Sequence, residues 1–230
     1  MENKVFKDRV ADYLMGSSPD EINNEVLELQ TLMSYYKCAM HEIEGKFKVL
    51  NEQFSLQHER NPIESIKTRL KSFGSIREKL ERKGLPLTTQ SIWDNLNDVA
   101  GIRVVCAFPD DVYMLANAFL AQDDITLLKK KDYIANPKPN GYRSLHLIVS
   151  VPIFLAHEKR VMKAEIQLRT IAMDSWASLE HQLRYKKDFE FTEHMANELQ
   201  ICASLSAELD ARMDALRDLV QGDIINTENN

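Results

Sequence analysis

Basic and aromatic residues crowd into one short stretch of the sequence, KKKDYIANPKPNGYRSLH at positions 129–146. From Lys129 to Arg143 it holds five basic residues and one acid, a local charge of +4 in a chain whose formal charge is −6. Prolines stiffen the backbone and Gly141 permits a close turn, which would hold Tyr142 as a stacking surface for a base. The stretch therefore predicts a pocket for an anion that carries a base, and an ordinary solvated hairpin loop is the alternative.

Polar side chains also occupy one face of four expected strands, because successive residues of a strand point to opposite faces. The strand expected at 99–108 is apolar except for Arg103, and the strand at 144–154 has His146 opposite its leucines and valines. The other polar positions are Ser65, Lys67, Arg69 and Lys71 on the strand at 63–71, and Lys163, Glu165, Gln167 and Arg169 on the strand at 161–169. If these faces coincide, they form the floor of a cleft rich in cations. A solvent-exposed face would explain the polar residues of the strand at 161–169 equally well.

Two carboxylates accompany these cations: Glu165, and Asp98 shortly before Arg103. In proteins, Mg²⁺ is usually held by one or two carboxylates together with phosphate oxygens, while Lys and Arg neutralise the remaining phosphate charge. The pattern predicts a divalent metal at Asp98 and Glu165. It also predicts phosphoryl or nucleotidyl transfer, in which positioning and charge stabilisation supply most of the catalysis.

Four motifs occur in order along the chain: DVAGIRV at 98–104, KDYIANPKPNGYRSLH at 131–146, EIQLRT at 165–170 and EHQLRYK at 180–186. Together they resemble the (p)ppGpp synthetase domain of the RelA/SpoT homologue family, in the short form called small alarmone synthetases. The resemblance covers about residues 60–187. It implies a Mg²⁺-dependent GTP pyrophosphokinase, which transfers pyrophosphate from ATP to the ribose 3′-hydroxyl of GTP or GDP and releases AMP. The length further implies a synthetase without the hydrolase and regulatory domains of the long family members.

On the ATP side, the resemblance implies that Asp98 and Glu165 hold Mg²⁺. Glu165 would share the metal or take the proton from the attacking hydroxyl. Arg69 and Arg103 match the arginines that sandwich the adenine, a use that suits flat guanidinium groups better than lysines. The matching phosphate-binding positions are Lys71 and Lys79.

On the guanosine side, the resemblance implies that Tyr142 stacks on guanine. Asp174, one turn into the next expected helix, could pair with the N1–H and 2-amino edge of guanine, or could be a plain acid near a helix N-terminus. Gln167 and Glu180 could orient the site. The full set of expected GTP- or GDP-binding residues is Lys129, Lys131, Lys138, Asn140, Tyr142, Arg143, His146, Gln167 and Asp174.

The succession of elements predicts a fold of the α/β (α+β) class, with a mixed sheet of about five strands, of nucleotidyltransferase-like type, flanked by helices. A fifth strand is expected at 125–134, and helices at 75–83, 90–97, from Pro109, at 170–185 and at 191–220. The predicted divisions are an N-terminal helical extension at 1–58, a synthetase domain at 59–187, an oligomerisation helix at 188–221 and a disordered tail at 222–230.

Long helices are expected near both ends of the chain. Ser18 and Pro19 form a helix start, with Ser as N-cap and Pro at the first helical position. The apolar stripe that follows could pack against the same chain or a partner subunit; it consists of Leu29, Met33, Tyr36, Met40, Ile43, Phe47, Leu50 and Phe54. A second stripe, interrupted by Ser206, consists of Met195, Leu199, Cys202, Leu209, Met213, Leu216 and Val220. Because small synthetases of this family form homotetramers through such helices, the resemblance implies a homo-oligomer, and a tetramer in particular.

Composition weighs against several alternatives. The acidic chain shows no extended basic face, which argues against a nucleic-acid partner and against the family branch that pyrophosphorylates the 3′ end of tRNA. A non-catalytic nucleotide-binding regulator would be favoured if Asp98 or Glu165 were replaced, and both are present. Cys38 and His41, one turn apart on a helix, are two potential metal ligands and do not make a closed site.

The sequence also predicts where the protein works. Its three cysteines are widely spaced, its N-terminus lacks an apolar leader, and its longest apolar run is too short to cross a bilayer. We therefore expect a cytoplasmic protein with reduced thiols and no membrane partner.

Overall fold

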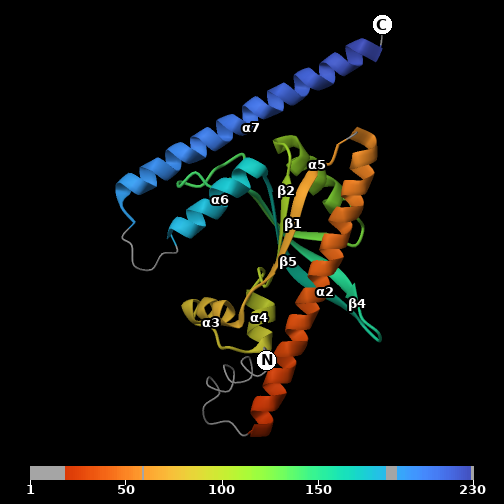
Figure 1. The fold of residues 1–230 in the computed structure, drawn as a ribbon. Coiled ribbons are helices and arrows are strands. Elements are labelled where there is room, and N and C mark those ends of the chain that lie inside the picture. The colour runs from red at the N-terminus through yellow and green to blue at the C-terminus, as the bar shows by residue number, and fades with distance from the viewer. Residues whose placement is uncertain (1–18, 59, 185–190, 229–230) are drawn as a thin grey trace.

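The computed structural model describes residues 19–58, 60–184 and 191–228, which form one five-stranded sheet with helices around it (Figure 1). The strand order is β1-β2-β5-β4-β3, with β2 and β5 parallel and the other neighbouring pairs antiparallel. The predicted mixed five-stranded sheet is thus confirmed. The strands are β1 (Ile63–Leu70), β2 (Ala100–Cys106), β3 (Thr126–Asp132), β4 (Leu145–Phe154) and β5 (Lys159–Thr170). The helices are α2 (Pro19–His58), α3 (Phe73–Arg82), α4 (Thr89–Asn95), α5 (Pro109–Leu120), α6 (Ile171–Arg184) and α7 (Glu193–Glu228).

Local side-chain contacts explain why some elements differ from the predicted ranges. α3 begins two residues earlier than expected, because the Ser72 side chain accepts a hydrogen bond from the Ser75 N–H and caps the helix there. β3 ends at Asp132 because this carboxylate accepts hydrogen bonds from the N–H groups of Ile134 and Ala135, which turns the chain.

The ends of the two long helices also bear on the predictions. α2 begins at Pro19 as expected, while the proposed N-cap Ser18 lies outside the described residues. α7 continues to Glu228, so it runs into the stretch that was expected to be a disordered tail. Residues 229–230 lie outside the described part.

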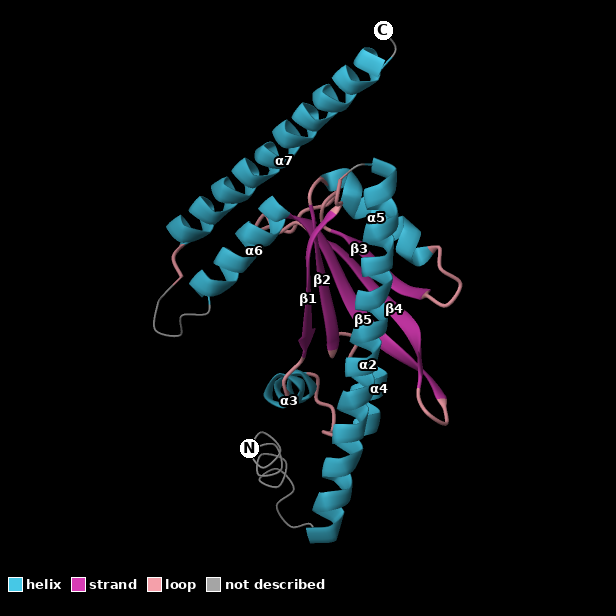
Figure 2. Cartoon of the chain, turned by 45° about the vertical axis from the view of Figure 1, so that its right-hand side comes forward, coloured by secondary structure: helices cyan, strands magenta, loops and turns pink. Residues whose placement is uncertain are grey.

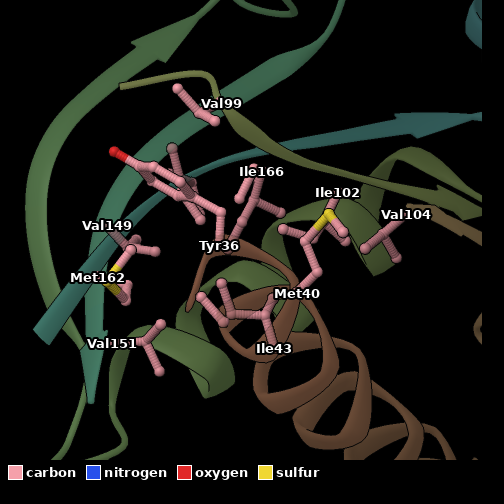
Figure 3. Close-up of a cluster of buried hydrophobic side chains, with 14 of the residues drawn as sticks. Tyr36, Met40, Ile43, Val99, Ile102, Val104, Val149, Val151, Met162 and Ile166 are labelled. Carbon is pink, nitrogen blue, oxygen red and sulfur yellow. The ribbon is translucent and has the colours of Figure 1, made fainter. Parts of the chain in front are cut away.

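The apolar stripe of α2 packs against the sheet of its own chain, which confirms the first of its two predicted roles. Tyr36, Ile43 and Phe47 are fully buried. Figure 3 shows Tyr36 and Ile43 of α2 beside the side chains of Ile102 and Ile166 from the sheet. α5 packs on α2 and the same sheet, and the Phe47 ring stacks on an α5 phenylalanine. One face of the sheet is therefore covered by α2 and α5 (Figure 2), which leaves the other face for polar groups.

α6 follows β5 directly, and α7 packs along α6 (Figure 1). The indole N–H of Trp176 on α6 donates a hydrogen bond of 3.0 Å to the Leu199 carbonyl of α7. The side of α7 that faces the body buries Ala203 and Asp210, whereas the apolar stripe predicted for this helix remains about half exposed at Leu209. Its other half-exposed members include Met213, Leu216 and Val220. Across the described ranges, no helix combines the length and the apolar character needed to cross a bilayer.

Candidate active site

The register of the sheet sets the predicted polar side chains in two rows across the face away from α2. In strand order, the first row is Lys67, Arg103, Gln167, His146 and Lys131. The second row is Arg69, Gly101, Glu165, Ile148 and Lys129. Residues directly opposite one another on neighbouring strands point to the same side of a sheet. The expectation that the four strands share one polar face is therefore confirmed.

A pocket of about 310 Å³ lies over the β1, β2 and β5 part of these rows. It brings together both predicted catalytic carboxylates, Asp98 and Glu165, although 67 positions separate them in the sequence. At Gly101 the second row has no side chain, which leaves space on the floor between β1 and β5. The full lining is Lys67, Arg69, Lys71, Ser75, Asp98, Gly101, Ile102, Arg103, Glu165 and Gln167.

Two lysines hold the carboxylate of Asp98. The ammonium groups of Lys71 and Lys79 lie 2.8 and 2.6 Å from Asp98 Oδ2. Burial on its own raises the pKa of Asp98, but the hydrogen bonds and charges of the two lysines outweigh burial, so the pKa lies below its usual range. Asp98 Oδ1 is buried and has no hydrogen-bond partner among the described residues. A buried carboxylate oxygen without a donor suits a bound cation.

Glu165 is held by neighbours on its own face of the sheet. Gln167 Nε2 donates to Glu165 Oε2 at 3.0 Å, and His146 Nδ1 lies 3.5 Å from Oε1. Burial raises the pKa of Glu165, yet the contacts with His146 and Gln167 outweigh it and lower the pKa below its usual value. The nearby charge of Asp98 acts in the opposite direction. Glu165 is therefore an ionised carboxylate at neutral pH. Gln167 holds one of its oxygens, which agrees with the expectation that Gln167 could orient the site.

A buried arginine connects Glu165, through Gln167, to the basic and aromatic stretch at 129–146. Arg169, only 2% exposed, donates one hydrogen bond to Gln167 Oε1 and one of 2.9 Å to the Tyr142 hydroxyl. The same hydroxyl lies 2.8 Å from His146 Nε2. Burial is the main reason that the pKa of Tyr142 is raised. Tyr142 is thus anchored through its hydroxyl to the polar rows.

The loop before β4 is ordered by its own backbone. Gly141 has a φ of +86°, which glycine adopts without strain. Its N–H donates a hydrogen bond of 2.8 Å to the Lys138 carbonyl. The Asn140 side chain accepts from the Tyr142 N–H and lies within 3.4 Å of Glu180. The Lys138 ammonium sits 4.7 Å from the ring centres of both Tyr133 and Tyr142. The predicted rigid turn is present, and one face of the Tyr142 ring already meets a cation.

Asp174 lies among three basic groups. Its carboxylate is 3.1 Å from Arg103, 3.3 Å from Lys67 and 3.4 Å from Arg169. It is buried, so it is more than an exposed acid near a helix N-terminus. Its predicted contact with the guanine edge stays a prediction, and a base there would share the carboxylate with these cations.

Of the predicted guanosine-binding residues, Gln167 alone belongs to the pocket lining, and three of the others lie on the exposed edge strand or face α7. Lys129 and Lys131 belong to the two rows but sit exposed on β3, the edge strand. Arg143, expected among the phosphate ligands, instead pairs with Asp210 of α7 at 3.1 Å. The loop therefore delivers Tyr142 and Lys138 toward the rows, whereas the Arg143 guanidinium is directed to the C-terminal helix.

The sequence placed Lys67 and Arg169 on the expected cleft floor without assigning either a ligand, and it gave no role to Ser75 or Asp210. The alternation of polar residues already placed Lys67 and Arg169 on the site face, so that pattern could have identified both. Ser75 lies in the first turn of α3 beside the pocket and had no distinguishing signal. Asp210 is 40 residues from its nearest partner in the sequence, Thr170, and only the folded structure reveals the contact.

The residues present fit a metal bound jointly with a nucleotide. Within the described parts of the chain, no three His, Cys, Asp or Glu side chains converge as a self-sufficient metal site. Cys38 and His41, considered above as potential metal ligands, accordingly have no third ligand among the described residues. Asp98 and Glu165 supply two carboxylates, and Mg²⁺ commonly completes such a pair with substrate phosphates and water.

Replacing Lys79 with Met should raise the pKa of Asp98, because the change removes a hydrogen bond and a charge that oppose the effect of burial. A carboxyl whose folded pKa is lowered stabilises the fold above its unfolded pKa, about 3.9, and that stabilisation is lost as the pH falls toward the folded value. The Met variant should therefore lose less stability on acidification. Titration of the aspartate carboxyl signals by NMR measures the shift. Lys83→Met is the control, since this ammonium donates to the Asn95 carbonyl. An unchanged Asp98 titration in Lys79→Met would contradict the assignment.

Comparisons with known proteins agree with this geometry. Residues 68–190 match the family model described as a region found in RelA/SpoT proteins. GTP pyrophosphokinase YwaC of Bacillus subtilis is 41% identical over 194 residues, which are 84% of this chain and 92% of that protein. The crystal structure of small alarmone synthetase 2 from B. subtilis covers 83% of this chain with 98% of its own, at a TM-score of 0.76 and 39% identity. That of small alarmone synthetase 1 from B. subtilis, bound to its product pppGpp, covers 81% of this chain with 94% of its own, at a TM-score of 0.73 and 35% identity. The chain belongs to the RelA/SpoT family.

Proposed function

We propose that this chain is a GTP pyrophosphokinase, which transfers pyrophosphate from ATP to the ribose 3′-hydroxyl of GTP or GDP. The 3′-oxygen would attack the β-phosphorus of ATP, the bond from that phosphorus to the α-phosphate oxygen would break, and AMP would leave. The observation that supports this most is the convergence of Asp98 and Glu165 in one pocket lined by lysines and arginines. A relative that was solved with pppGpp as its product supports the same reaction class.

The β1 and β2 side of the pocket would bind ATP. Arg69 and Arg103 line it with guanidinium groups, which suit the faces of an adenine. Lys71 and Lys79 would bind the phosphates. Both lysines are held in place by Asp98 before a nucleotide arrives, so little side-chain freedom would be lost on binding.

Asp98 and Glu165 would hold Mg²⁺ together with the phosphates of ATP. When bound, the ion would neutralise charge on the transferring group and help to align it. The unpartnered Oδ1 of Asp98 is the oxygen available for this purpose. Glu165, ionised because of its contacts with His146 and Gln167, could in addition accept the proton of the attacking 3′-hydroxyl.

The guanosine acceptor would bind between α6 and the part of the sheet formed by β5, β4 and β3. The Tyr142 ring would stack on guanine, and Asp174 could recognise the base edge. Basic groups toward β3 would then meet the acceptor's phosphates. The residues proposed for this side are Lys129, Lys131, Lys138, Asn140, Tyr142, His146, Gln167 and Asp174.

Two rival functions have less support. A tRNA 3′-end pyrophosphokinase would need a basic surface for the body of the tRNA, whereas this chain is acidic as a whole and lines its pocket with a local group of lysines and arginines. A non-catalytic regulator would not need two acids beside phosphate-binding lysines. Incubation of the purified chain with ATP, Mg²⁺ and GTP, GDP or GMP in turn tests the proposal directly, with AMP and a 3′-pyrophosphorylated nucleotide as the expected products.

Glu165→Gln should lower turnover by about 10²–10⁴-fold, since the amide cannot accept a proton and binds metal weakly. Nucleotide binding should remain largely intact, because the shape of the side chain is kept. Thin-layer analysis of labelled ATP with GDP measures the product. Glu158→Gln is the control, as this exposed glutamate pairs with Arg160 on the β4–β5 hairpin. Undiminished product from Glu165→Gln would reject its catalytic role.

Tyr142→Ala should weaken binding of the guanosine acceptor by about 1–3 kcal/mol, the usual worth of stacking one base on an aromatic side chain. The apparent affinity for ATP should change far less. Tyr142→Phe keeps the ring and loses the contacts of the hydroxyl with Arg169 and His146, so it should retain most of the acceptor affinity. Steady-state kinetics with each substrate varied in turn measures both. Equal weakening of ATP and acceptor in Tyr142→Ala would argue against stacking.

We further expect a cytoplasmic homo-oligomer, and a tetramer in particular. The half-exposed apolar stripe of α7, which includes Leu209 and Leu216, supports the oligomer. Light scattering should give about four times the mass of one chain. The double change Leu209→Glu and Leu216→Glu should lower that mass, because carboxylates are costly to bury in an apolar interface. A wild-type chain that runs as a stable monomer would overturn the expectation.

A further inference from the structure

α7 contacts the acceptor loop, defined here as residues 136–143, at two points. Near the start of the contact, Gly141 approaches the helix so closely that a Cβ at this position would collide with the Ala203 side chain. Two helical turns further on, Arg143 of the loop pairs with Asp210 at 3.1 Å. The loop that carries Tyr142 is therefore enclosed between the sheet and the C-terminal helix.

Asp210 has the setting of a structural anchor. It is 6% exposed, although aspartates are rarely buried unless paired. Its Oδ2 receives the Arg143 guanidinium and a hydrogen bond of 3.0 Å from the Thr170 hydroxyl. Thr170 is fully buried at the end of β5, five residues after Glu165. One carboxylate thus ties the loop to the strand that carries the catalytic glutamate.

The direction of Arg143 is the second observation. The Arg143 side chain is 15% exposed, and its Nη1 points to Asp210 of α7. In Figure 1, α7 lies beside α6 at one end of the sheet, on the side where the loop projects. The pair engages the guanidinium through Nη1 and fixes the direction of the side chain toward the buried carboxylate of α7.

We propose that Asp210 is a positioning residue of the acceptor site: through Arg143 and Thr170 it holds the acceptor loop in the conformation that presents Tyr142 to guanine. The inference rests on the proposed function, and it assigns Arg143 to the loop anchor instead of the acceptor's phosphates. α7 thereby becomes part of the guanosine site as well as a helix at its edge.

The anchor and phosphate-ligand roles predict different dependences on phosphate number. Asp210→Asn should raise the Kd of GMP, GDP and GTP by a common factor of about ten, as expected when the competent loop falls to about a tenth of its population. Arg143→Gln should do the same, and the double variant should be no worse than either single variant. The Kd of ATP and the kcat at saturating acceptor should change less than about twofold. Calorimetry with each nucleotide gives the affinities, and Glu208→Gln, a neutralised carboxylate on the exposed side of α7, is the control.

Three results would overturn the inference. The first is a loss for Arg143→Gln that grows from GMP to GTP, which is the mark of a phosphate ligand. The second is Asp210→Asn that binds guanine nucleotides as well as the wild type, and the third is losses for the two single variants that add in the double. If Asp210→Asn fails to fold, as judged by thermal unfolding, the dependence of Arg143→Gln on phosphate number decides the question alone.

A hydrogen-exchange measurement separates this inference from the proposed function. The N–H groups of Lys138 and Gly141 are hydrogen-bonded within the loop. They should exchange faster in Asp210→Asn than in the wild type or in Glu208→Gln, and equal rates would reject the anchor. A wild-type chain that binds no guanine nucleotide would reject the proposed function, while the exchange rates would still report on the anchor.

Discussion

Parallel hydrogen bonding between β2 and β5 sets Gly101 opposite Glu165 and Arg103 opposite Gln167, and the rest of the site is built outward from these pairs. A slip of one residue would turn every side chain of a strand to the other face. The fully buried Ile102 and Ile166, which alternate with the site residues under α2, oppose such a slip. The packing of the core and the composition of the site therefore follow from one register.

Electrostatic pairing is the second constraint on this face. A charge buried without a partner is costly, and removal of one member of a buried pair leaves the other uncompensated. Asp98 has two lysines, and Asp174 has Lys67, Arg103 and Arg169. The cations outnumber the acids, so the face favours a polyanion even though the chain as a whole is acidic. The pairs also hold the cations in defined positions before any nucleotide is present.

Much of this arrangement could be predicted from the sequence, because local patterns determine it. Alternation of polar and apolar residues placed Lys67, Arg103 and Glu165 on one face, and a helical stripe identified the buried side of α2. The partner of Arg143 could not be predicted, because Asp210 lies 67 residues further along the chain and only tertiary packing brings the two together. Asp174 likewise acquires its three cations from β1, β2 and β5. Neither contact leaves a periodic signal.

The contacts of α7 also show what a periodic sequence pattern can and cannot predict. Apolar periodicity marked a stripe of α7 of which Leu199 packs on α6 while later members remain half exposed. Small and charged residues such as Ala203 and Asp210 make the buried contacts with the body that periodicity did not mark. Periodicity finds surfaces that are held by the hydrophobic effect, and it does not find surfaces held by close backbone approach and single ion pairs.

Strand order explains why the contact of α7 with the loop matters for the reaction. The proposed ATP residues come from β1, β2, α3 and the position after β1, and Glu165 comes from the central β5. Most of the proposed acceptor residues come from β4, β3 and the loop between them, with Gln167 on β5 and Asp174 on α6. The sheet and the adjoining helix α3 fix the ATP side, whereas the acceptor side includes a loop, so that side needs a contact from outside the sheet to hold it in place.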